Sequence, residues 1–315
     1  MTQIETPGSL IEFQERFRTD RACERYLFSW RWPEGFRCPR CHGTQARRLR
    51  TRPVYQCGRC RRQTSVTAAT VLHGTKVPLR KWFWAIFLVA RHKKSISALQ
   101  LQRDLSLGSY RSAWFMLQRI RVAFGEKTQW PLKGVVEVDE TLVGAHEKGD
   151  RPGKDPGHKA IVVGAVGLGT GHARAHRWAG VRLGHVPDYT GQSLGAFVRA
   201  NVERGSKLLT DGWRAYDHLV KEGYARESEV SSALTKPEMR VQNPLPHVHL
   251  LFSNLKTWLA GTFHGVTQKY LPGYLREFEY RVNRRHDPRS LFGWVARRMM
   301  HHPPHPLAWV RAATG

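Results

Sequence analysis

Acidic residues are scarce in this chain of 315 residues, where 25 Asp and Glu stand against 51 Lys and Arg. The formal net charge is +26, which indicates a polyanionic partner and carries no information about the fold. Nucleic acid is the leading candidate for that partner. A protein that binds a membrane surface through its basic residues is the competing interpretation.

Long apolar runs are also missing, which argues against the membrane. The longest run, residues 82–90, is far shorter than the about 20 residues that a helix needs to cross a bilayer. Residues 1–17 contain acids and have no basic segment followed by an apolar one, so no secretory signal is visible. We therefore expect no membrane partner and a bacterial-type cytoplasmic location, close to the nucleoid.

Repeats at the period of a solenoid protein are absent, so ordinary globular domains are expected. The length and the 41% of hydrophobic residues suffice for two or three domains with sizeable cores. Changes of pattern along the chain divide it into residues 1–70, 71–130 and 131–290, followed by a basic tail rich in His and Pro at 291–315. The histidines of that tail do not have the spacing of a metal site.

Cysteines are few, but four of the five form two Cys-x-x-Cys pairs, Cys38 with Cys41 and Cys57 with Cys60. Each pair can form a tight knuckle, and a hairpin between them closes a tetrahedral zinc site of structural type. A disulfide framework would need an oxidising compartment, and a redox function would not need two copies. Cys23 stands apart and is expected to be a small buried hydrophobe.

Arginines are dense around the cysteine pairs. Such a basic ribbon suits contact with DNA phosphates, and a solvated basic surface is the alternative. The residues concerned are Arg47, Arg48, Arg50, Arg52, Arg59, Arg61 and Arg62.

Helical periodicity marks two parts of the N-terminal half. Residues 5–30 form a helical lead-in, with Ser9 available as an N-cap. Residues 79–124 predict three helices, and the break at 105–108 separates the last two. Two short helices joined by a turn that contains glycine fit a helix-turn-helix, which would present Arg111 to DNA, although ordinary helical hairpins have the same rhythm.

Strands follow from residue 131 onward, and two of them end in an aspartate. We expect strands at 135–140, 161–167, 173–183 and 207–211, with helices at 192–202, 248–259 and 267–285. Asp139 is fixed by a run of β-branched residues, and Asp211 ends a short buried strand, where open α/β sheets place their sites. Either carboxylate could instead cap a turn.

Two acids at strand ends and a third group on a late helix are the arrangement that two-metal phosphoryl transfer needs. Mg²⁺ and Mn²⁺ prefer hard oxygen ligands, and at least one carboxylate must bridge the two ions. The sequence therefore raises the hypothesis of a nuclease-type metal site in the domain that begins at residue 131.

Several motifs in order resemble the insertion-sequence DDE transposases related to the Merlin superfamily, which carry an ISXO2-like transposase domain. They are Val-Glu-Val-Asp-Glu-Thr at 136–141, Thr-Asp-Gly-Trp-x-x-Tyr at 210–216, Asn-Leu-Lys-x-Trp-Leu-x-Gly-Thr-x-His-Gly-Val at 254–266, and Glu-Phe-x-x-Arg-x-Asn-Arg-Arg at 277–285. Arg-Trp-Pro-x-Gly-Phe-Arg-Cys-Pro at 31–39 extends the resemblance to the cysteine ribbon.

The resemblance implies a ribonuclease-H-like fold of α/β class, a mixed sheet flanked by helices. It implies an enzyme that cuts transposon ends with Mg²⁺ or Mn²⁺ and joins their 3′ hydroxyls to target DNA. The zinc ribbon and the helix-turn-helix-like region would bind DNA. A homo-oligomer is implied because two transposon ends must be brought together.

Residue by residue, Asp139 matches the first acid of that family and Asp211 the second, while Lys256 matches the lysine of the last catalytic helix. The family's glutamate lies seven residues before this lysine, where the present chain has His249. Asn254 is the other nearby group that could bind a metal. Each has a plain alternative, His249 beside a phosphate and Asn254 on the helix surface.

DNA contacts are expected at Lys256, which could also be an ordinary exposed lysine, and at the basic patch of Arg281, Arg284 and Arg285. Three other functions compete with transposition. A DNA-binding regulator would need neither Asp139 nor Asp211, a structure-specific nuclease would cut without joining, and a decayed transposase would only bind ends.

Overall fold

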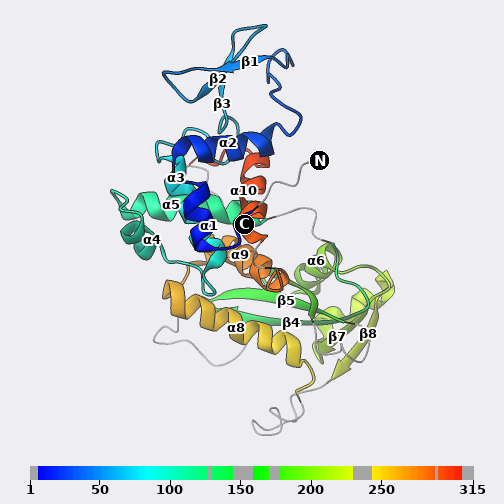
Figure 1. Cartoon of the computed structure of the whole chain (residues 1–315). Helices are drawn as coiled ribbons and strands as arrows, with labels where there is room; N and C mark the ends of the chain where they lie inside the picture. The colour runs from blue at the N-terminus through cyan, green and yellow to red at the C-terminus, as the bar shows by residue number, and fades with distance from the viewer. Residues whose placement is uncertain are drawn as a thin grey trace. The chain divides into compact units, whose positions relative to one another are not determined.

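The computed structural model describes residues 6–125, 130–144, 159–169, 178–229, 243–287 and 290–306 (Figure 1). The chain divides into two compact units. The N-terminal unit combines the residues up to Gly125 with those from Arg284 to Ala313, and the sheet unit runs from Glu126 to Asn283.

The described part of the N-terminal unit contains six helices. They are α1 (Leu10–Arg16), α2 (Asp20–Arg31), α3 (Leu79–Arg91), α4 (Ala98–Asp104), α5 (Tyr110–Phe124) and α10 (Leu291–His301). Ser9 caps α1 as expected, since its hydroxyl accepts the Glu12 N–H at 3.1 Å. Cys23, also as expected, is fully buried on α2, and burial raises the pKa of its thiol to about 12. The core beneath these helices is aromatic.

The stretch 291–315, expected to be a tail, begins instead with helix α10. Its apolar residues recur at helical spacing, and Phe292 is 1% exposed among rings from the first helices. The centroid of its ring lies 5.6 Å from that of Phe13 and 5.5 Å from that of Phe17. Residues from the two ends of the chain therefore share one core. Residues 307–315 lie outside the described part.

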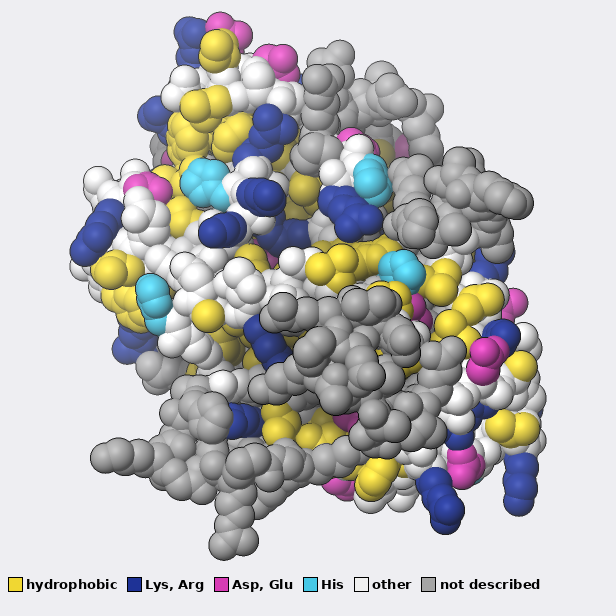
Figure 2. All heavy atoms as spheres, turned by 90° about the horizontal axis from the view of Figure 1, so that it is seen from below, with side chains coloured by type: hydrophobic (Ala, Val, Ile, Leu, Met, Phe, Trp, Pro, Cys, Tyr) yellow, Lys and Arg dark blue, Asp and Glu magenta, His cyan; other side chains and the backbone are white. Residues whose placement is uncertain are grey.

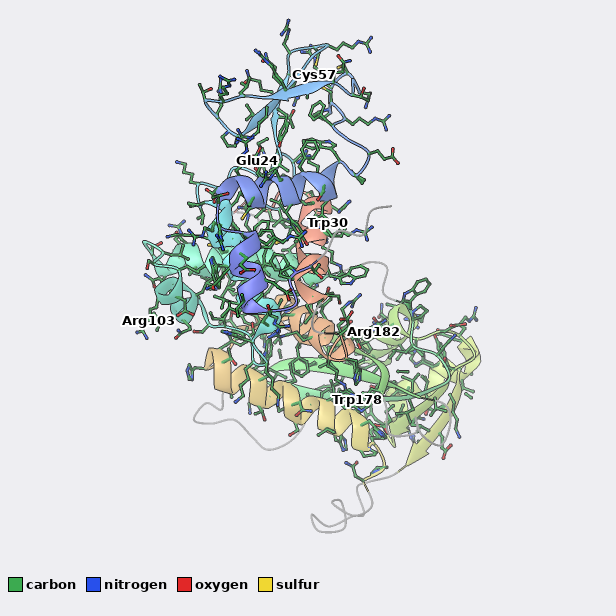
Figure 3. All side chains as sticks on the ribbon, viewed as in Figure 1. Glu24, Trp30, Cys57, Arg103, Trp178 and Arg182 are labelled. Carbon is green, nitrogen blue, oxygen red and sulfur yellow. The ribbon has the colours of Figure 1, made fainter. Side chains whose placement is uncertain are left out.

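The cysteine ribbon is a three-stranded antiparallel sheet of β1 (Ala46–Arg48), β2 (Val54–Cys57) and β3 (Gln63–Ser65). It packs on α2 through a buried ion pair: Arg48 donates to both carboxylate oxygens of Glu24 at 2.8–3.0 Å. Figure 3 labels Glu24 on α2 and Cys57 in the ribbon. Ring contacts of Tyr55 with Phe28 and Trp32 complete the interface.

The three helices expected at 79–124 are present as α3, α4 and α5. The break between α4 and α5 falls at 105–109, where Ser106 and not Gly108 adopts a positive φ of 47°. Ser109 caps α5, and its hydroxyl accepts the Ser112 N–H at 3.2 Å. The first turn of α5, with Arg111, is exposed.

The sheet unit contains a mixed five-stranded sheet, as the sequence predicted for this α/β domain. Its strands are β4 (Val135–Val143), β5 (Ala160–Leu168), β6 (Trp178–Val186), β7 (Lys207–Asp211) and β8 (Ala225–Glu229), in the order β6-β5-β4-β7-β8. The β4–β5 and β5–β6 pairs are antiparallel, while β4–β7 and β7–β8 are parallel. The strand expected at 173–183 is described from Trp178 onward, and the polar β8 was not expected.

Helices cover both faces of this sheet, as Figure 1 shows. On one face lie α8 (Pro246–Phe263) and α9 (Leu271–Asn283), joined by the short η3 (Gln268–Tyr270), and on the other α6 (Gly191–Asn201) and η1 (Arg214–Glu222). Helix α8 approaches β5 closely, because a Cβ atom at Gly164 would lie 2.6 Å from the Phe252 ring. No helix in the described ranges is long and apolar enough to cross a membrane.

Candidate functional site

The four ribbon cysteines converge at one point. The Sγ atoms of Cys38 and Cys60 lie 3.5 Å apart, those of Cys41 and Cys57 3.6 Å apart, and all four lie within 4.8 Å of one another. Sulfurs that bind one zinc ion at about 2.3 Å lie about 3.8 Å apart in a regular tetrahedron. The four-cysteine cluster therefore fits a closed structural zinc site.

Backbone N–H groups favour the thiolate, the form that binds zinc, at Cys38 and Cys57. The backbone N–H of Cys41 lowers the pKa of the Cys38 thiol to about 6, and the backbone N–H of Cys60 lowers the pKa of Cys57. At Cys41, in contrast, the effect of the Gly43 backbone N–H is outweighed by desolvation and the neighbouring thiols, which raise the pKa of its thiol to about 11. Each pair is followed by a residue with positive φ, His42 at 57° and Arg61 at 59°. These left-handed residues turn the chain back at the end of each knuckle, where the His42 N–H donates to the Cys38 carbonyl and the Arg61 N–H to the Cys57 carbonyl.

Asp139 and Asp211 lie side by side on neighbouring parallel strands. The register of β4 and β7 pairs Glu137 with Leu209, so two residues further along each strand the aspartates come level. Glu140 joins them, and one carboxylate oxygen from each of the three residues lies within 4.8 Å of the others. Three carboxylates at this distance repel one another unless protons or cations are present.

Glu140 is held by Tyr216 of η1. The Tyr216 hydroxyl donates to Glu140 Oε2 at 2.9 Å, and the tyrosine is fully buried. Burial, followed by the negative charges of Glu140, Asp139 and Asp211, raises the pKa of Tyr216 well above 10. The hydroxyl thus remains protonated and keeps donating to Glu140.

His249 of α8 contacts one of these acids, Asp139. Its Nε2 lies 3.0 Å from Asp139 Oδ2, and this hydrogen bond raises the pKa of the imidazole against the opposing effect of burial. A protonated His249 would neutralise one of the three carboxylates. The imidazole is nevertheless outside the group of three oxygens that could share an ion.

Asn254 and Lys256 follow on α8, and both are exposed. Lys256 lies seven residues after His249, two helical turns along the same face. Desolvation lowers the pKa of its ammonium group, and the charge of Asp139 opposes that shift. The lysine therefore lies within electrostatic reach of the acids.

Two family models match this chain. Residues 131–283 match the ISXO2-like transposase domain, and residues 18–63 match the transposase zinc-ribbon domain. The chain therefore carries an ISXO2-like transposase domain, preceded by a transposase zinc ribbon. A relative from Halobacterium salinarum, an uncharacterized protein in transposable element ISH50, is 28% identical over 290 residues, which cover 84% of this chain and 91% of the relative. No solved structure matches this chain.

On the face drawn in Figure 2 the Lys and Arg side chains are scattered and not gathered into one patch. Arg281 is 12% exposed, and its Nε lies 3.8 Å from Oε1 of the buried Glu277. Arg284 stacks over Trp294 at 5.2 Å, and Arg285 is exposed. Of the expected DNA contacts, Arg111, Lys256 and Arg285 are therefore the exposed ones.

Glu137, on the strand of the acids, is the most enclosed carboxylate near the site. Its side chain is 2% exposed and accepts the backbone N–H groups of His247 at 2.9 Å and Val248 at 2.8 Å. Its other oxygen lies 2.6 Å from His247 Nδ1. The carboxylate thus caps the N-terminus of α8.

Sequence reasoning left out four residues that the structure brings to the site: Glu137, Glu140, Tyr216 and His247. One signal for two of them was present. An acid occurs at 137 and 139 and a histidine at 247 and 249, so both pairs have the same spacing. The Tyr216–Glu140 bond spans 76 residues and had no such local signal.

Proposed function

We propose that this protein is the transposase of a bacterial insertion sequence, which binds the transposon ends and catalyses metal-dependent DNA cleavage and strand transfer. The observation that carries the proposal is the convergence of Asp139, Glu140 and Asp211 to within 4.8 Å at neighbouring strands of the ISXO2-like domain. A regulator that only binds DNA has no need for such a cluster. Because a transposase binds DNA, we expect the protein to be associated with the nucleoid.

The sheet topology supports a ribonuclease-H-like core. Three antiparallel strands are continued by two parallel ones, in the order β6-β5-β4-β7-β8, and helices lie on both faces. The two aspartates occupy the central strand β4 and its parallel neighbour β7. This is the arrangement expected from the resemblance.

The donor set suits Mg²⁺ or Mn²⁺, which prefer carboxylate oxygens. When bound, divalent ions would activate the attacking oxygen and stabilise the leaving oxygen at a phosphodiester. Asp139 and Asp211 would hold them, with Glu140 as the third carboxylate. Glu140 would then supply the negative charge that the family's glutamate supplies from α8, where this chain has His249.

The residues of α8 would act around the acids. His249 would orient Asp139 through its Nε2, which leaves the other Asp139 oxygen available. Lys256, two turns further along, would contact a DNA phosphate. Asn254 is a second candidate ligand from the same helix.

Binding of the transposon ends would fall to the N-terminal unit. The zinc ribbon offers exposed arginines at 47, 50 and 52, and the first turn of α5 offers Arg111 in a helix-turn-helix-like pair with α4. Arg284 and Arg285 would add contacts after α9, and Arg281 lies one turn before them. Joining two ends requires a homo-oligomer.

The test uses purified protein, labelled terminal-repeat DNA and a plasmid target, with either Mg²⁺ or Mn²⁺. We expect joined products, and a loss of about 100- to 1000-fold for Asp139→Asn and for Asp211→Asn with DNA binding retained. Glu203→Gln, an exposed acid of the same unit, is the control and should join ends as the wild type does. Nicks alone would support a nuclease, and a mobility shift without cleavage would support a regulator or a decayed transposase.

A further inference from the structure

Helix α8 is joined to strand β4 by two carboxylate–imidazole pairs, Glu137 with His247 and Asp139 with His249. We propose that the first pair positions the second: Glu137 and His247 fix α8 against β4 in the register that brings His249 to Asp139, and so set the metal affinity of the site. Neither residue of the positioning pair needs to touch metal or DNA. The inference rests on the proposed function, because it assigns a task towards the same metal site.

Glu137 takes the place of an N-cap side chain for α8. The residue at the N-cap position, Leu245, makes no side-chain cap bond, and Pro246 occupies the first turn. The amides of His247 and Val248 are bound instead by Glu137, from a strand 110 residues earlier. An anion at a helix N-terminus also interacts favourably with the helix dipole.

The side chain of Glu137 is held in place by burial and by hydrogen bonds. Its side chain is 2% exposed, and its neighbours Val136 and Val138 are fully buried in the opposite face of the sheet. A carboxylate removed from water is tolerated when its oxygens are bound, and here three hydrogen bonds bind them. The side chain is therefore fixed relative to β4, and the first turn of α8 is fixed relative to the side chain.

The two pairs share one register. Asp139 follows Glu137 by two residues on the same face of β4, and His249 follows His247 by two residues on α8. A shift of the helix by one residue would rotate it by about 100° and carry His249 away from Asp139. The same shift would move Lys256, so the contacts of Glu137 set the placement of every α8 residue proposed for the site.

The test measures Mn²⁺ binding to the full-length, zinc-loaded protein by calorimetry, without DNA. We expect Glu137→Gln, at a temperature where circular dichroism shows a folded protein, to weaken Mn²⁺ binding about 10- to 100-fold, the effect typical of losing a residue that orients a ligand. Glu279→Gln is the matched control. Glu279 is a buried glutamate of the same unit that accepts the Leu183 N–H at 2.9 Å and pairs with Arg182 (labelled in Figure 3) at 3.7 Å.

If Glu137 had only a structural role, Glu137→Gln and Glu279→Gln would have the same effects on thermal stability and on Mn²⁺ affinity. If Glu137→Gln lowers thermal stability as Glu279→Gln does and leaves the Mn²⁺ affinity of the wild type, the positioning role is overturned. Should Glu137→Gln fail to fold, His247→Asn and His247→Ala give the same comparison. Asparagine keeps a donor near the position of Nδ1 and should retain Mn²⁺ affinity, whereas alanine should weaken it, and equal affinities would again overturn the inference.

The outcomes separate this inference from the proposed function. A wild-type protein that joins ends and binds Mn²⁺, with Glu137→Gln unchanged in affinity, would contradict the positioning role alone. A wild-type protein that binds no Mn²⁺ would contradict the proposed metal site and the inference with it.

Discussion

The hydrogen bond between His249 and Asp139 makes the charge of the acid cluster depend on pH. The bond raises the pKa of His249 above its ordinary value of 6.5, so the folded protein holds this proton more tightly than the unfolded chain does. The contribution to the free energy of unfolding is then fully present below about pH 6.5 and is lost as the pH rises through the raised pKa. We expect the metal-free protein to lose stability over that interval.

Urea unfolding of the metal-free wild type and of His249→Asn at about pH 6 and about pH 9 measures this contribution. The wild type should lose more stability between the two pH values than the variant does. Addition of Mn²⁺ should reduce the difference, because cations at the carboxylates replace the charge of the imidazolium. If the wild type and the variant lose the same free energy of unfolding between the two pH values, the hydrogen bond with Asp139 does not raise the pKa of His249.

The elements could be read from the sequence where their periodicity is strong. Strand β7 occupies the expected residues 207–211, and β4 begins at the expected residue 135 but continues to 143. Strand β8 is polar and lies at the edge of the sheet, so no apolar alternation marked it. Helix α10 was hidden by the His- and Pro-rich composition that follows it, although its apolar spacing was present.

The sequence predicted only part of the candidate site. Strand alternation predicts on which face of the sheet a side chain lies, but not where the end of a long side chain is positioned. Alternation puts Glu140 on the face opposite Asp139, yet near the end of β7 its carboxylate approaches both aspartates. The bonds that hold Glu137 and Glu140 join residues 110 and 76 positions apart. Contacts of that kind follow from the fold and have no local sequence pattern.

The ribbon packs on α2 through Arg48. Among the arginines of the ribbon, Arg48 therefore has a structural role, whereas exposed ones such as Arg50 are available to DNA. Replacing Arg48 by Ala would leave Glu24, whose side chain is 3% exposed, without its cation. Loss of one partner of a buried pair costs about 3–5 kcal/mol, and we expect the lower end because Arg48 is 27% exposed. Chemical unfolding of the Arg48→Ala variant measures this loss.

Arg50→Ala is the matched control on the same ribbon. Arg50 is exposed, so its removal should change the free energy of unfolding by less than about 0.5 kcal/mol and should reduce the salt dependence of DNA binding. Equal destabilisation by the two substitutions would contradict the assignment of Arg48 to the interface with α2.

The segments up to Gly125 and from Arg284 to Ala313 belong to one unit, and residues 126–283 of the sheet unit lie between them in the sequence. The N-terminal unit therefore completes its core only when α10 arrives, after the whole sheet unit has been synthesised. Arg298 of α10 reinforces that core by donating to the carbonyl of Phe124 at 3.2 Å. The sheet unit, in contrast, is continuous in sequence from Glu126 to Asn283.

Truncation after Asn283 should thus unfold the N-terminal unit and spare the sheet unit. Five of the residues that α10 buries are large and apolar: Leu291, Phe292, Val295, Met299 and Met300. At about 1.5–3 kcal/mol each, their loss is comparable to the whole stability of an ordinary domain. Limited proteolysis with mass spectrometry should find cleavage throughout residues 6–125, whereas the described strands and helices of the sheet unit should stay protected. Truncation after residue 306 is the control and should leave both units resistant. A resistant N-terminal fragment in the shorter protein would mean that α10 is dispensable to the core it occupies.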